Sequence, residues 1–162
     1  MATIAVTGST GRLGGRVARR LDSAGIPQRL LVRDVSRAPA LAATTVARAD
    51  YSDASTVSAA LADIDTVFMV SAAETPDRVD QHRTFIDAAA HSGVRHLVYT
   101  SFFGASPTAT FTLARDHWAT EEYVKASGLA YTFLRDNLYA DFFAFMVGDD
   151  GVIRGPAGNG RA

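Results

Sequence analysis

Three glycines spaced three residues apart, Gly8, Gly11 and Gly14, form the motif in this sequence most able to do chemistry. They follow the apolar run at residues 4–6 and open into a helical pattern, which predicts a turn from a buried strand into a helix. The unpaired N–H groups and the dipole of a helix N-terminus attract phosphate, provided that no side chain blocks the approach. The motif therefore predicts a cradle for the pyrophosphate of a dinucleotide; the alternative is a flexible loop with incidental glycines.

A basic residue, Arg33, ends the second expected strand, where a site specific for NAD carries an acid for the ribose 2′-hydroxyl. The planar guanidinium of arginine can instead grip a 2′-phosphate. We therefore expect NADP(H) to be the preferred cofactor, with Arg12 or Arg37 as a second contact. The adjacent Asp34 keeps NAD(H) possible, and the alternative for Arg33 is a solvated charge at a strand end.

Small and polar residues follow the next three expected strands. Asp50 comes after the third strand, and although it could cap a helix, Asp53 already serves that purpose. The small residues at 71–73 leave room for a cofactor backbone to pass closely, although core packing explains them equally well. Residues 100–104 change from small to aromatic, which suits a cofactor floor beside an apolar substrate. These strand ends predict one continuous site at one edge of a sheet.

Helices alternate with strands along the chain. Glycine stops three expected helices, at Gly25, Gly93 and Gly128, and an apolar run follows each stop. Near-continuous apolar strands such as 66–70 are typical of a parallel sheet buried on both faces. The expected fold is a single doubly wound α/β domain over residues 1–162, a Rossmann fold with strand order 3-2-1-4-5-6. We expect strands at residues 3–7, 28–33, 44–49, 65–70, 95–100 and 130–135, and helices at 12–24, 54–62, 77–92, 113–127 and 137–146.

Composition excludes several classes of function. The 162 residues carry 16 basic and 17 acidic side chains, so there is no excess positive charge to bind nucleic acid. There is no cysteine, and the four histidines lack the spacing of metal ligands, so we expect no metal site. The apolar run at residues 4–6 is too short for a signal peptide or a membrane span. We expect a cytoplasmic protein that binds no membrane.

Five stretches carry a resemblance to a known family: residues 7–15, 31–34, 98–101, 117–121 and 127–135. Together they make the chain similar to the NmrA-like atypical short-chain dehydrogenase/reductase family, and most similar to its NAD(P)H:quinone reductase branch. The opening TGxxGxxG pattern is a variant of the dinucleotide fingerprint, and the last stretch is more specific than the glycines. The resemblance covers essentially the whole chain.

The residues and the resemblance together predict the members of the site. The resemblance implies that Asp50 accepts a hydrogen bond from the adenine amino group. The expected cofactor contacts are Gly8, Ser9, Thr10, Gly11, Arg12, Leu13, Gly14, Arg33, Asp50, Tyr51, Ser71, Ala72, Thr100 and Ser101. The expected substrate contacts are Phe102, Phe103, Asn137 and Tyr139.

The catalytic pair usual in the short-chain superfamily, Tyr-x-x-x-Lys, is absent from the sequence. The corresponding helix offers His117 and, one turn later, Glu121. Reduction of a ketone needs a positioned acid to protonate a developing alkoxide, so the loss argues against an alcohol dehydrogenase or a sugar epimerase. A reduced quinone is a weakly basic phenolate that water can protonate, so a well-placed hydride donor suffices. His117 is the catalytic candidate, as proton donor or orienter; the alternative is a structural histidine.

The C-terminal part departs from the family pattern. Family members continue into a small substrate-covering subdomain that we expect to be missing here, with residues 147–162 as its truncated start. In the expected helix 137–146, one apolar face is formed by Leu138, Phe142, Phe145 and Met146. A contiguous apolar patch marks a contact with another chain, so we expect a homodimer or another association through this helix.

Two functions remain open. The first is an NADPH-dependent reductase that transfers hydride to a quinone-like or other planar electrophilic small molecule, which Arg33 and the aromatic residues near the site favour. The second is a catalytically silent NAD(P)-binding regulator that reports redox state to a partner protein, which the missing Tyr-x-x-x-Lys pair favours.

Overall fold

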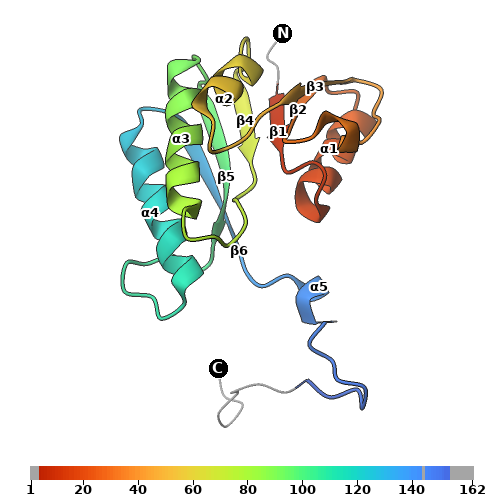
Figure 1. The fold of residues 1–162 in the computed structure, drawn as a ribbon, viewed down its shortest axis with the longest axis vertical. Coiled ribbons are helices and arrows are strands. Elements are labelled where there is room, and N and C mark those ends of the chain that lie inside the picture. The colour runs from red at the N-terminus through yellow and green to blue at the C-terminus, as the bar shows by residue number, and fades with distance from the viewer. Residues whose placement is uncertain (1–3, 144, 154–162) are drawn as a thin grey trace.

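Six parallel strands form one sheet (Figure 1). The computed structural model describes residues 4–143 and 145–153, without the side chain of Phe142. The order across the sheet is β3-β2-β1-β4-β5-β6, so the predicted doubly wound fold is confirmed. The strands are β1 (Ile4–Thr7), β2 (Gln28–Val32), β3 (Thr44–Arg48), β4 (Thr66–Met69), β5 (His96–Phe102) and β6 (Ala130–Asp136).

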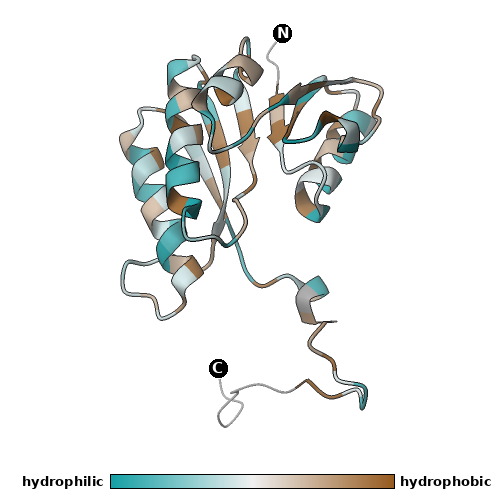
Figure 2. Cartoon of the chain, viewed as in Figure 1, coloured by the Kyte–Doolittle hydropathy of each residue, from teal (hydrophilic) through white to brown (hydrophobic). Residues whose placement is uncertain are grey.

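The helices divide between the two faces of the sheet. Ala5 and Val6 are neighbours in β1 and point to opposite faces, yet both are fully buried. Ala5 belongs to the large apolar cluster beneath the helices on one face, and Val6 to a smaller cluster beneath a helix on the other. Figure 2 shows apolar residues along the central strands and polar residues on much of the outer helical surface. The three helices of the first face are α2 (Ala54–Ala60), α3 (Arg78–His91) and α4 (Thr112–Ala126), and the helix of the second is α1 (Arg12–Ser23).

More helices cover the first face of the sheet than the second, and β4 is therefore less buried on the second face than the sequence predicts. Val67 and Met69 in β4 are fully buried toward α2–α4, whereas Phe68 between them is only half-buried. On the same face as Phe68, Leu134 in β6 is 42% exposed. The prediction of burial on both faces therefore holds fully for one face and in part for the other, because within the described residues α1 packs mainly on β1 and β2 and Phe68 lies at the edge of their cluster.

The C-terminal helix is much shorter than predicted. In place of a helix at 137–146, the structure has α5 (Ala140–Phe143), which lies away from the sheet (Figure 1). Short helices outside a packed layer are marginal, and four residues cannot present the continuous face expected from the sequence. Leu138, Phe145 and Met146 are nonetheless exposed, at 51%, 75% and 38%. Much of the expected substrate region at 147–162 lies outside the described residues.

Candidate functional site

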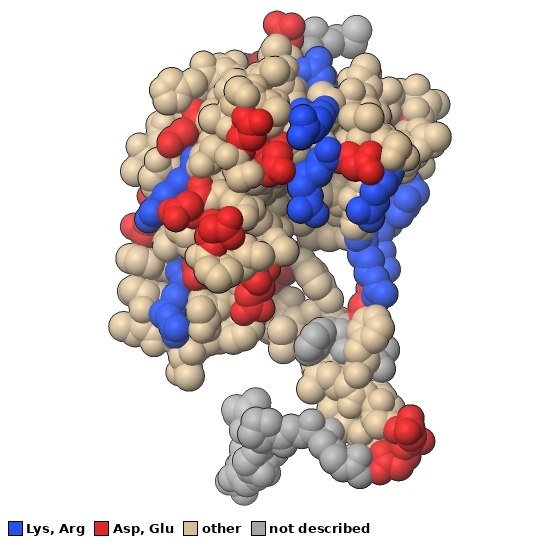
Figure 3. Space-filling model, viewed as in Figure 1, with Lys and Arg blue, Asp and Glu red and all other residues tan. Residues whose placement is uncertain are grey.

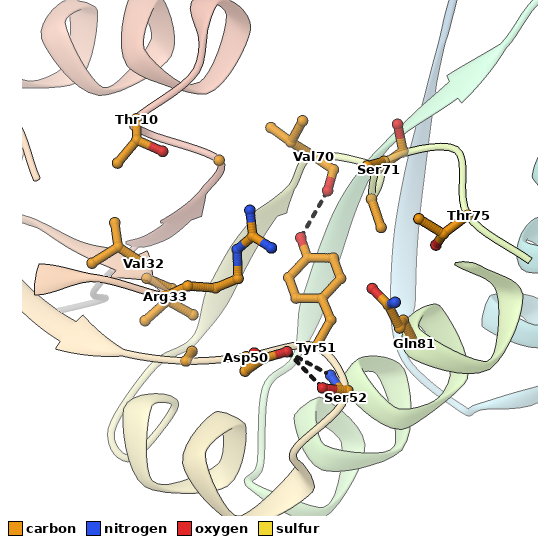
Figure 4. Close-up of a pocket in the computed structure, with 15 residues that line it drawn as sticks. Thr10, Val32, Arg33, Asp50, Tyr51, Ser52, Val70, Ser71, Thr75 and Gln81 are labelled. Carbon is orange, nitrogen blue, oxygen red and sulfur yellow. Dashed lines mark hydrogen bonds between the residues drawn. The ribbon is translucent and has the colours of Figure 1, made fainter. Parts of the chain in front are cut away.

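A pocket of about 380 Å³ opens at the carboxyl ends of the strands, between β1 and β4, where the strand order reverses. This switch point is where open α/β sheets bind ligands (Figure 4). The structure brings seven of the expected cofactor contacts together here: Gly8, Thr10, Arg33, Asp50, Tyr51, Ser71 and Ala72. The other lining residues are Leu31, Val32, Ala49, Ser52, Val70, Ala73, Thr75 and Gln81.

The glycine turn at one end of the pocket is built for close approach. Gly8 has a φ of +63°, and a Cβ there would lie 3.0 Å from the Cβ of Val70. Helix α1 begins at Arg12 after the N-cap Gly11, and no side chain caps its first N–H groups. The first turn of α1 contains no acidic residue. The turn therefore offers donors and a positive dipole end to an anion, as the sequence predicts.

Arg33 and Asp50 bring opposite charges to the other end of the pocket. In Figure 4 Arg33 reaches into the pocket from the end of β2, and Asp50 lies beside Tyr51. The Ser52 N–H (3.0 Å) and hydroxyl (2.7 Å) donate to Oδ1 of Asp50, and with the charge of Arg33 they lower the pKa of that carboxyl. Figure 3 shows basic side chains gathered over the α1 and β2–β3 side of the molecule, and acidic ones over the α2–α4 side.

One wall of the pocket, the segment 70–72 that follows β4, is held by side chains from other elements. The hydroxyl oxygen of Thr7 accepts the N–H of Val70 at 2.8 Å, and that of Thr100 accepts the N–H of Ser71 at 2.9 Å. The Tyr51 hydroxyl donates to the carbonyl of Val70 at 2.7 Å (Figure 4). Thr100 is 3% exposed and does not line the pocket. It supports the wall from the buried side through its hydrogen bond to Ser71.

His117 lies in the core behind this wall and is 5% exposed. Its Nε2 is 2.9 Å from Nη2 of Arg78, and its Nδ1 is 2.8 Å from the hydroxyl of Tyr99. Since arginine can only donate, Nε2 must accept and the ring proton lies on Nδ1. Burial, together with the charge of Arg78, lowers the pKa of His117 to about 3. His117 does not line the pocket in the described residues, so its catalytic role stays a prediction.

Comparison with known proteins decides the family. A model of the NAD(P)H-binding family matches residues 8–142, which span the glycine turn, all the pocket residues and β6. The chain belongs to this family.

Two named relatives of this NAD(P)H-binding chain are a quinone oxidoreductase and an azoreductase. It is 36% identical to quinone oxidoreductase 2 of Escherichia coli over 98% of its length, and 33% identical to an NAD(P)H azoreductase of Xenophilus azovorans over 98%. Each alignment covers 57% of the relative, so the chain spans little more than half the length of these proteins.

Two solved structures share the fold of this chain, a reductase at 35% identity and a transcriptional regulator at 20%. The chain superposes on a Citrobacter sp. triphenylmethane reductase in complex with NADP(H) with a TM-score of 0.81 and 35% identity, over 87% of this chain and 51% of the other. It also superposes on NmrA, a negative transcriptional regulator, with a TM-score of 0.78 over 93% of this chain and 52% of the other, but at 20% identity, which shows a shared fold alone.

The remaining expected contacts of this family member lie outside the pocket. Arg12, Leu13 and Tyr139 line a second hollow of about 390 Å³ between α1 and α5. The Ser101 hydroxyl donates to Glu121 at 2.6 Å, on the α4 side of β5. Phe102 stacks on the ring of His117, with the centroids 6.0 Å apart, and Asn137 accepts the N–H of Leu138. Phe103 is 68% exposed, and Ser9 is buried. Gly11 and Gly14 support the glycine turn. The ligand contacts predicted for residues named in this paragraph stay predictions.

Sequence reasoning missed the contribution of α3. Gln81 of α3 lines the pocket, as does Thr75 just before this helix, and Arg78 and His82 lie directly behind it. The available signal was the spacing of Arg78 and His82, four residues apart and hence on one side of a helix otherwise expected to cover a sheet. Within the described residues, no three carboxylates or histidines cluster as metal ligands, and no helix is long and apolar enough to cross a membrane.

Proposed function

We propose that the pocket binds NADP(H), with the pyrophosphate at the glycine turn and the adenosine 2′-phosphate beside Arg33. The observation that carries this proposal is the pocket itself, which joins Gly8 and Thr10 to the exposed guanidinium of Arg33. The positive-φ turn at Gly8, which lines the pocket, and the uncapped start of α1 fit a pyrophosphate. The Citrobacter reductase in complex with NADP(H), similar over 87% of this chain, supports the same ligand.

We further propose that the protein is a reductase of quinone-like or other planar conjugated small molecules. NADPH would supply the hydride when bound. The chain's own part is to bind and orient: the glycine turn and Arg33 hold the cofactor, and the segment 70–72 bounds it on one side. Quinone, azo and triphenylmethane acceptors, named for the relatives, are all extended conjugated systems.

The proton that completes the reduction comes from solvent in this proposal. Both ring nitrogens of His117 are engaged, and the buried ring is neutral, so it is poorly placed to donate a proton to a ligand. Addition of a hydride to a quinone gives the hydroquinone monoanion, and its single phenolate oxygen takes the one remaining proton from water. The proposed contacts of the acceptor remain Phe102, Phe103, Asn137 and Tyr139. A cytoplasmic location is also part of the proposal. The exposed apolar side chains near α5 are proposed to be buried in a homodimer.

The test is a titration of the chain with NADPH, followed by turnover of NADPH against a panel of quinones and azo dyes. Binding with turnover supports the reductase. Binding without turnover of any acceptor favours the second function, the silent regulator, which the absent Tyr-x-x-x-Lys pair also favours. Failure to bind NADPH would overturn both proposals.

A further inference from the structure

The backbone N–H and C=O of Ala72 are each held by a side chain of α3. Nε2 of His82 accepts the N–H of Ala72 at 2.8 Å, and Nε of Arg78 donates to the carbonyl of Ala72 at 2.9 Å. Since Arg78 and His82 are four residues apart, they project from the same side of the helix. Gln81, next to His82, lines the pocket itself. The start of α3 therefore serves the pocket both directly and through Ala72.

Both side chains are buried and bonded further inward, so their positions are fixed. Arg78 is 2% exposed and His82 is 0% exposed. Because Nε2 of His82 accepts from a backbone N–H, the ring proton lies on Nδ1 and is donated to the hydroxyl of Thr120 at 2.9 Å. Thr120 in turn donates to the carbonyl of Asp116 at 2.9 Å. The direction of every bond from α4 to Ala72 is thus determined.

Ala72 completes a pattern along the wall of the pocket. Three consecutive N–H groups, those of Val70, Ser71 and Ala72, are each accepted by a side chain from a different element: Thr7 in β1, Thr100 in β5 and His82 in α3. Such a wall has its shape before a ligand arrives, and a preformed site avoids part of the entropy loss of binding.

We propose that Arg78 and His82 are positioning residues of the cofactor site, which hold the wall 70–72 in its ligand-binding shape. This inference rests on the proposed binding of NADP(H). In this role Arg78 and His82 of α3 act on the ligand through the backbone of Ala72 and not by contact. His82 connects the core of the protein to the wall of the pocket.

The test compares two amide variants of His82 that differ by one methylene group. The side-chain oxygen of His82→Gln reaches to about the place of Nε2 and can still accept from Ala72, whereas His82→Asn reaches only to the place of Nδ1 and cannot. The readouts are hydrogen exchange at the Ala72 amide without ligand and the dissociation constant for NADPH. We expect His82→Asn to exchange at least tenfold faster at Ala72 and to bind NADPH about tenfold more weakly, as loss of one hydrogen bond implies, and His82→Gln to stay near the wild type in both.

The control is Val124→Ala, which removes two methyl groups from a fully buried side chain of α4 away from the pocket. We expect it to lose stability but to keep both the exchange at Ala72, measured relative to global unfolding, and the affinity for NADPH. Equal affinity of wild type and His82→Asn, or equal loss in His82→Asn and Val124→Ala, would overturn the positioning role. A wild-type chain that does not bind NADPH would instead overturn the proposed function on which it rests.

Discussion

A Cβ on Gly14 would lie 2.5 Å from both the carbonyl carbon and the carbonyl oxygen of Gly8. Helix α1 thus crosses the glycine turn at a distance that no side chain permits. Gly11 differs, because a Cβ there would lie 3.3 Å from the Gly8 carbonyl oxygen, a tight but adjustable contact. Gly14 therefore serves packing, whereas the predicted role of Gly11 is to leave access for the ligand.

We expect Gly14→Ala to destabilise the fold by about 1–3 kcal/mol, the usual range for an overpacked contact. Gly11→Val should keep its free energy of unfolding within about 1 kcal/mol of the wild type, yet lose NADPH binding, because its branched side chain projects at the start of α1 where a pyrophosphate would lie. Urea unfolding and calorimetric titration measure the two effects. The reverse pattern, with Gly11→Val unfolded and Gly14→Ala unaffected, would contradict the assignment.

Arg33→Ala should weaken NADPH binding by about tenfold or more, since a charge-assisted hydrogen bond contributes roughly 1.5–3 kcal/mol. Binding of NADH, which lacks the 2′-phosphate, should change little. Parallel titrations with the two cofactors check this, and Arg20→Ala, at an exposed arginine of α1 that does not line the pocket, serves as the matched control. Equal effects of Arg33→Ala on both cofactors would show that Arg33 does not read the 2′-phosphate.

His117→Ala should lower stability by about 1–3 kcal/mol, because it leaves the buried Nη2 of Arg78 without its partner. Turnover per molecule of bound NADPH should fall by less than about tenfold, since general acid catalysis usually contributes a hundredfold or more. Chemical unfolding and steady-state kinetics separate the two quantities. A hundredfold loss of turnover with NADPH affinity intact would establish His117 as the catalytic acid.

Stability should fall as the pH drops below about 6.5. Burial, together with the charge of Arg78, lowers the pKa of His82 and of His117 from 6.5 to about 3. The unfolded state therefore binds more protons between these values, so unfolding becomes easier as the pH falls through this window. The two histidines together should remove about 3 kcal/mol between pH 6.5 and pH 5. Urea unfolding across this range measures the slope, and His82→Gln should reduce it by about half.

The exposed apolar side chains near α5 should bury in a dimer. Phe145 is 75% exposed and Met146 is 38% exposed, and burial of each such side chain contributes roughly 1.5–3 kcal/mol. We expect light scattering to show a dimer that Phe145→Ser with Met146→Ser dissociates, whereas Val35→Ser, at another exposed apolar residue (55%), has no effect. A wild-type chain that stays monomeric at micromolar concentration would rule out this association.

The sequence predicted the sheet and the position of the pocket well, for identifiable reasons. Apolar β-branched runs and the stops at Gly25, Gly93 and Gly128, which all have positive φ in the structure, set the alternation of helix and strand. The ends of parallel strands then had to meet at one edge. The segment at 137–146 was misjudged because apolar spacing alone does not make a helix where no sheet or helix layer supports it.

The contacts behind the pocket could not be predicted in the same way. Thr100 stays a predicted ligand contact, and the hydrogen bond between its hydroxyl and the backbone of Ser71 was not foreseen. His117 was considered for its chemistry, yet its neighbours Arg78 and Tyr99 come from other elements. Such tertiary pairings depend on how α3 and α4 lie on β5, which a pattern of single residues does not contain.

The hydrogen bonds of the wall 70–72 also bear on folding. Thr7 and Val70 are 63 residues apart, and Ser71 and Thr100 are 29 apart, so these bonds can form only after β1, β4 and β5 have paired. The bond from Ala72 to His82 requires that α3 has docked as well. A molecule with a nearly complete sheet but a loose α3 would lack the finished wall, so ligand binding should be among the last properties to appear on refolding.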